Sequence, residues 1–135
     1  MTKRLIYSFA ATVLAAASLY AEPPIKAQIP FPFHVGGSVL PAGVYTTDMS
    51  IRSGVVLMLR SADCKSSAVV LTNGVLATGE SNQPRFVFQR YGDEYFLYQV
   101  WTGQSGVGHQ LAKSRLEIEV EARAKRGIQT ILATK

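Results

Sequence analysis

The sequence is poor in the residue types that most often carry covalent chemistry or bind metals. Among its 135 residues there is one cysteine, Cys64, and there are two histidines, His34 and His109. A lone cysteine excludes a disulfide within the chain, so the fold must be stabilised by its core. Cys64 lies in the polar segment S-A-D-C-K-S-S, which predicts an exposed turn and a thiol without a chemical role.

Charged residues are also scarce, at 17% of the chain, and the formal net charge is only +5. The basic residues are scattered, and no stripe of them alternates with aromatic side chains. Such a stripe is typical of nucleic-acid-binding domains. We therefore expect no nucleic-acid partner.

The first 21 residues have the composition of a secretory signal peptide. Lys3 and Arg4 precede an apolar run over residues 5–17, and the small residue Ala21 precedes Glu22. We expect cleavage after Ala21, with residues 22–135 as a single β-rich domain.

Two alternatives to this cleavage stay open. Residues 15–17, all alanine, offer a second processing site, and an uncleaved segment would act as a membrane anchor. Residues 5–21 are at the lower limit of the length that spans a bilayer, and they contain polar residues. We thus expect an exported protein, periplasmic or extracellular, with no stable membrane span after cleavage.

The mature chain opens with a long alternation of apolar and other residues, I-K-A-Q-I-P-F-P-F-H-V, from Ile25 to Val35. A period of two over this length predicts one β-strand with one face on a core. Pro30 and Pro32 have the same parity, so the N–H groups that they lack would point to the same side. The pattern predicts an edge strand.

The next segments are typical of short strands separated by turns. Turns are predicted at residues 36–37 and 41–43. Asn73-Gly74 is the strongest hairpin signal in the chain and predicts a two-residue turn. The apolar run over residues 55–60 predicts a central strand covered on both faces. The strands expected in this part of the chain are 44–51, 55–60, 68–72 and 75–77.

Residues 85–101 predict a hairpin with two apolar faces. With residues 92–93 as its two-residue loop, Phe88 lies opposite Leu97 and Val87 opposite Tyr98. One face then carries Phe86, Phe88, Tyr95, Leu97 and Trp101. The other, the aromatic face, carries Val87, Tyr91, Phe96, Tyr98 and Val100.

Two apolar faces mean either that both are covered or that one binds something. We expect the aromatic face to be the contact surface for a ligand or partner, with Tyr98 near its centre. A platform of Trp101 with Tyr91, Tyr95 and Tyr98 for a sugar or an apolar ligand is a weaker option, because hairpin aromatics more often form core.

Residues 115–125 fit two patterns. Apolar residues at 116, 118 and 120 alternate with glutamates as in a strand, whereas Ser114 and Glu117 fit the capping box of a helix. We favour a helix over about 115–125, followed by a strand over 128–133, and the alternative of a strand stays open. The ion pairs expected along the helix are Glu119 with Arg123 and Glu121 with Lys125.

Residues with catalytic or metal-binding chemistry are isolated from one another. His109 follows three glycines in a predicted flexible loop, where a general base could be presented. Ser105 lies in G-Q-S-G-V, which misses the G-x-S-x-G pattern by one position. His34, His109 and Cys64 have none of the short spacings of zinc ligands, and the glycines lack the lysine of a phosphate loop. We expect no catalytic residue, no metal and no cofactor.

The mature chain contains three further recognisable blocks: I-P-F-P-F-H-V-G-G-S-V-L-P-A-G-V-Y (29–45), R-Y-G-D-E-Y-F-L-Y-Q-V-W (90–101) and L-A-K-S-R-L-E (111–117). In these blocks it resembles a family of small exported bacterial proteins of unknown function. The resemblance implies no functional residues. It does imply that glycine often stands at the position of Cys64, as in an Asp-Gly turn.

We expect a mainly β domain, either a small antiparallel sandwich or a partly closed barrel of about seven or eight strands, with one C-terminal helix. The expected function is that of a non-catalytic binding or interaction module for an unknown protein or small ligand. One alternative is a carrier that holds a small apolar or sugar-like ligand inside the barrel. A hydrolase acting through His109 is the least favoured alternative.

Overall fold

The computed structural model of the chain describes residues 24–48, 56–77, 83–103 and 106–134. The expected signal peptide lies outside these ranges. The elements are β1 (Lys26–Ile29), β2 (Phe33–Val35), β3 (Ser38–Leu40), β4 (Gly43–Asp48), β5 (Val56–Ser61), β6 (Ser67–Leu76), β7 (Arg85–Tyr91), β8 (Glu94–Trp101), β9 (Val107–Leu111), α1 (Arg115–Glu121) and β10 (Arg126–Leu132). The mainly β fold with one helix near the C-terminus is confirmed.

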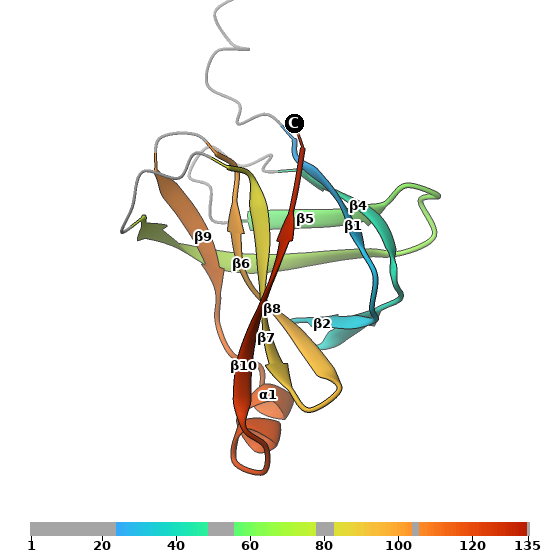
Figure 1. Cartoon of the computed structure of the whole chain (residues 1–135). Helices are drawn as coiled ribbons and strands as arrows, with labels where there is room; N and C mark the ends of the chain where they lie inside the picture. The colour runs from blue at the N-terminus through green and yellow to red at the C-terminus, as the bar shows by residue number, and fades with distance from the viewer. Residues whose placement is uncertain (1–23, 49–55, 78–82, 104–105, 135) are drawn as a thin grey trace, which may run out of the picture.

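The strands form one strongly curved sheet (Figure 1). In space they follow the order β1, β4, β5, β6, β9 and β8, and β7 and β10 continue the sheet beyond β8. The backbones of Lys26 in β1 and Thr134, just after β10, exchange two hydrogen bonds of 2.8 Å. This bridge joins the two ends of the sheet, so the sheet curls into a partly closed barrel.

The β2–β3 hairpin occupies a gap in the wall of this barrel. β8 pairs with β7 along one edge, and its other edge is divided between two neighbours. Residues 99–101 pair with β9, whereas Phe96 forms a parallel bridge with His34 of β2. The turn at residues 36–37 therefore lies where β9 ends.

The N-terminal alternation forms two strands, so the prediction of one strand over residues 25–35 is wrong. Its inward face is nevertheless as predicted, because every odd position is buried except Phe31, which is partly buried against the core. Pro30 has the parity of Lys26, whose N–H points away from β4 and toward Thr134. The donor that Pro30 lacks would therefore lie on the side away from β4, and after Ile29 the chain leaves β4 and crosses to β8.

β4 and β5 form the next part of the wall. β4 ends at Asp48, and the remainder of the strand predicted over 44–51 lies outside the described residues. The prediction that β5 is covered on both faces is wrong. Leu57 and Leu59 are buried in the core, whereas Val56 and Met58 are half-buried on the outer face, where no helix or strand of the described ranges forms a second layer.

The predicted hairpin at Asn73-Gly74 is wrong. β6 runs straight through both residues, with its first half paired to β5 and its second half to β9. A two-residue turn of the predicted type needs positive φ at both positions, and neither residue has it. Pairing with β9, which places Gly74 opposite His109, outweighs the local turn preference.

α1 begins as predicted but ends early. The Ser114 hydroxyl accepts a hydrogen bond of 3.2 Å from the Glu117 N–H, which caps the first turn. The helix ends at Glu121 rather than near residue 125, and β10 begins at Arg126. Neither predicted ion pair forms between these described residues. Instead, Glu121 pairs with Lys113 at 2.7 Å and lies 3.9 Å from Arg126.

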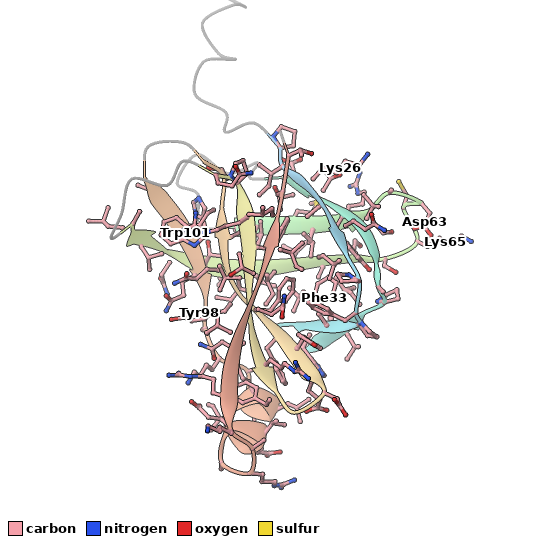
Figure 2. All side chains as sticks on the ribbon, viewed as in Figure 1. Lys26, Phe33, Asp63, Lys65, Tyr98 and Trp101 are labelled. Atoms are coloured by element: carbon pink, nitrogen blue, oxygen red, sulfur yellow. The ribbon has the colours of Figure 1, made fainter. Side chains whose placement is uncertain are left out.

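Aromatic rings occupy the interior of the barrel. The ring of Phe33 lies edge-on to Tyr45 at 5.1 Å and to Phe88 at 5.4 Å, and Figure 2 shows Phe33 inside the barrel. Phe31 stacks on Tyr95 at 3.7 Å and meets Phe88 at 5.0 Å. Ring pairs of this geometry stabilise a core beyond their area burial, by about 0.5–1.5 kcal/mol each.

Candidate binding surface

The β7–β8 hairpin contains a β-bulge that the sequence does not reveal. Phe88 lies opposite Leu97, as predicted. Val87 lies opposite Gln99, so Tyr98 has no partner residue in the ladder, and the predicted pair Val87–Tyr98 is wrong.

After the bulge, the residues of β8 lie on the opposite side of the sheet from the side predicted. Val100 is 0% exposed and belongs to the core, whereas Trp101 lies on the outer side, the reverse of the prediction. The Trp101 ring packs on Gly108, where an added Cβ would lie 2.6 Å from a ring carbon. The guanidinium of Arg85 lies 4.7 Å from the ring centroid, and the indole N–H donates to Gln99 at 3.1 Å. Trp101 therefore packs within the domain and does not form a sugar platform with the tyrosines.

The aromatic face does not form one exposed surface. Val100 points inward, and Val87, Tyr91 and Phe96 are at most 9% exposed. The ring of His34 stacks on Phe96 at 4.2 Å. Of the five, Tyr98 alone is half-buried and reachable, so four of the five residues expected at a contact surface are covered.

A carboxyl group is buried beneath α1, next to this covered face. Glu117 is 4% exposed, and its Oε1 lies 3.4 Å from the Tyr91 hydroxyl, which donates to Gln89 at 2.6 Å. Burial raises the pKa of Glu117, and the charge of Lys113 and the bond to Tyr91 oppose this shift. Burial, reinforced by the charge of Glu117, raises the pKa of Tyr91 to about 12.

The residues considered for catalysis and metal binding are not brought together. His109 lies in β9 and is 4% exposed, so its prediction as a loop residue is wrong. His34 stacks on Phe96, and Cys64 is exposed at the far tip of the β5–β6 hairpin. Ser105 lies outside the described residues. Within the described ranges no three His, Cys, Asp or Glu side chains are grouped to hold a metal ion.

Cys64 lies in an exposed polar turn, as predicted. The Asp63 carboxylate accepts hydrogen bonds from the Ser61 hydroxyl at 2.5 Å and from the Lys65 N–H at 3.0 Å. These two bonds lower the pKa of Asp63. Figure 2 shows Asp63 and Lys65 at the tip of the hairpin, away from the barrel.

Apolar side chains are exposed on the outer face of β6. Val69 is 61% and Leu71 70% exposed, and they lie opposite the half-buried Met58 and Val56 of β5. Beside them is an open hollow of about 350 Å³, the β6 groove, between β6, the turn after β2 and the end of β9. Its lining residues are Val35, Gly36, Gly37, Ser38, Val69, Val70, Leu71, Leu111 and Ala112. None of these nine residues is charged or aromatic.

Sequence reasoning missed the β6 groove for a physical reason. The segment A-V-V-L-T over residues 68–72 is apolar on both faces and resembles a buried strand. Whether a neighbour covers Val69 and Leu71 depends on the curl of the sheet, which has no local sequence signal. From the sequence, only the predicted turn at Gly36-Gly37 indicated where one wall of the groove would lie.

Comparison of the chain with protein-family models, with curated proteins and with solved structures gives no match. Among the described residues, no helix has the length and apolar character needed to cross a membrane.

Proposed function

We propose that the mature chain is an exported, non-catalytic binding module and that the β6 groove is its binding site. The observation that carries the proposal is the exposure of Val69 and Leu71 beside a hollow without a charged lining residue. Grouped exposed apolar side chains typically mark interaction sites on soluble proteins. The signal-like composition of residues 1–21 supports export.

The proposed occupant is an extended, uncharged and largely apolar segment of a partner protein. Gly36 and Gly37, which have no side chain, bring main chain to one wall, while Val69 and Leu71 present apolar surface at the other. A polypeptide has both an apolar side-chain surface and backbone amides, so it suits both walls. A fatty acid would find no cation among the lining residues for its carboxylate, and a sugar would find no aromatic ring.

The two alternative functions have weaker support. In a carrier, a ligand inside the barrel would need the space that the side chains of Phe33, Phe88 and Tyr45 occupy. A hydrolase would need a base within reach of a nucleophile and a substrate. His109 is instead buried in the β9 ladder.

The test is an NMR titration of residues 22–135 with a capped, neutral hexapeptide of alternating valine and threonine. We expect amide shift changes at residues 36–38, 69–71 and 111–112. Leu71→Lys places an ammonium group on the apolar wall and should weaken binding at least about tenfold, or about 1.4 kcal/mol.

The matched control is Leu132→Lys, because Leu132 is a similarly exposed leucine, at 65%, on the outer face of β10. It should leave the affinity unchanged. Equal losses in both variants would rule out the β6 groove as the site. Shifts in the groove with decanoate or maltose but not with the peptide would overturn the proposed occupant.

A further inference from the structure

α1 is attached to the sheet in an unusual way, because the one buried residue of its seven is an acid. Glu117 is 4% exposed, whereas Leu116 is 44% and Ile118 is 56% exposed. A helix that packs on a protein core normally buries its apolar side chains and exposes its acids. Apolar burial therefore contributes little to the docking of α1 on the sheet, and the contact made by Glu117 contributes more.

When Glu117 is ionised, the Tyr91 hydroxyl is the only group in this contact with a proton, and it has two acceptors. A phenol has a single proton, and the bond of 2.6 Å from Tyr91 to Gln89 uses it. Glu117 Oε1 lies 3.4 Å from the same hydroxyl. From that distance the hydroxyl gives an ionised Glu117 only a long, shared bond, whereas a protonated carboxyl group would itself donate to the Tyr91 oxygen. In that state the bonds run in one direction, from Glu117 through Tyr91 to Gln89.

The charges around Glu117 do not supply a substitute for that proton. The nearest cation, Lys113, is bound to both carboxylate oxygens of Glu121, at 2.7 and 2.8 Å. Arg126 lies 3.9 Å from Glu121 as well. An ionised Glu117 would thus sit buried beside a second carboxylate, without an ion pair of its own among the described residues. The titratable and charged groups around the contact are Tyr91, Lys113, Glu121, Arg126 and, through its stacking on Phe96, His34.

We propose that Glu117, Tyr91 and Gln89 form a proton-dependent latch, in which protonated Glu117 holds α1 against β7 and ionisation of Glu117 releases the helix. Release would uncover Tyr91 and, beside it, part of the aromatic face. The latch is independent of the β6 groove, which lies on other strands.

The direction of the pH dependence follows from the sign of the pKa shift. The pKa of Glu117 is raised when α1 is docked, so the docked state binds the proton more tightly than the released state. Docking is therefore complete below the ordinary pKa range of glutamate and weakens as the pH rises through the raised value.

The test is amide hydrogen exchange of residues 22–135 between pH 4 and 8, corrected for the intrinsic exchange rate. The amides of Ile118 and Ala122, which donate to Ser114 and Ile118 within the helix, report release. In the natural chain their protection should fall with pH, by up to about tenfold for each unit over which Glu117 loses its proton. In Glu117→Gln the amide can donate to Tyr91 at every pH, so the protection should be flat.

Glu119→Gln is the matched control, because it removes an exposed carboxylate from the same helix and leaves Lys113 bound to Glu121. Its protection should still fall with pH. A ¹³C titration of the Glu117 carboxyl in the natural chain gives a second measurement that needs no variant. An ordinary glutamate pKa there, or the same pH dependence in the natural chain and in Glu117→Gln, would overturn the latch.

Discussion

Cys64 lies in a backbone conformation that suits glycine better than cysteine. Its φ of 60° is the only positive value among the non-glycine residues that the structure describes. The conformation is imposed by the turn, in which the Cys64 N–H donates to the Ser61 carbonyl at 3.0 Å and Asp63 bonds to the residues on either side. For a residue with a Cβ the left-handed region costs about 1–2 kcal/mol.

Cys64→Gly should therefore raise the free energy of unfolding. Glycine removes the left-handed strain but adds freedom to the unfolded chain, so we expect a net gain of about 0.5–1 kcal/mol. Urea unfolding, followed by tryptophan fluorescence, measures it. Ala62→Gly is the control, since Ala62 has no positive φ to relieve, and this change should destabilise. A Cys64→Gly variant no more stable than the natural chain would contradict the strain argument.

At the scale of elements, the N-terminal strands show how proline is used at the edge of a sheet. Among the described residues, β1 pairs with β4 on one side and meets Thr134 on the other through the bridge at Lys26. Pro30 directly follows β1 with the parity of Lys26, so its missing donor falls on that open side, whereas Pro32 lies where the chain crosses to β8. Prolines on an edge limit pairing with other chains.

Replacing Pro30 and Pro32 together by valine should promote association between copies. The double variant regains the N–H donor of residue 30 on the open side of β1 and a second donor in the crossing to β8, without losing apolar character. Sedimentation velocity at rising protein concentration should show dimers or larger species that the natural chain lacks. Pro41→Val, in the turn before β4 on the paired side of β1, should stay like the natural chain. A double variant that remains monomeric would show that the edge is protected by something other than the prolines.

Elements whose partners are close in sequence could be predicted, and those that depend on distant partners could not. The β7–β8 hairpin and the Ser114 cap follow from local patterns, and so does the inward face of residues 25–35. The bulge at Tyr98 and the straight course of β6 through Asn73-Gly74 are imposed by strands elsewhere in the chain. For this reason the predicted binding face does not form one exposed surface: one skipped residue exchanges the facings of Val100 and Trp101, and α1 and His34 cover much of the rest.

On the scale of the whole molecule, the proposed signal peptide and the domain bear on different properties, export and stability. Residues 1–21 predict export, and the domain that follows has a single, exposed thiol and no internal disulfide. The core alone must stabilise it in whichever compartment it reaches.

Expression of the full chain in a bacterium should therefore yield a processed protein outside the cytoplasm. Intact-mass measurement should give a polypeptide that begins at Glu22. Changing Lys3 and Arg4 to glutamate, which removes the basic region of the leader, should retain the unprocessed chain. Full-length protein in the membrane fraction would support the anchor interpretation instead.

The bridge between Lys26 and Thr134 also sets the order of events in folding. It joins residues separated by nearly the whole domain, so the barrel cannot close until β10 has been synthesised and has reached β1. Contacts of such long sequence separation carry a large loop-closure entropy, and β domains of this kind fold in about milliseconds to seconds. If the chain is exported from its N-terminus, as we propose, β1 arrives before its partner at the other end. The open edge of β1 is thus most exposed during that interval, before the native fold exists.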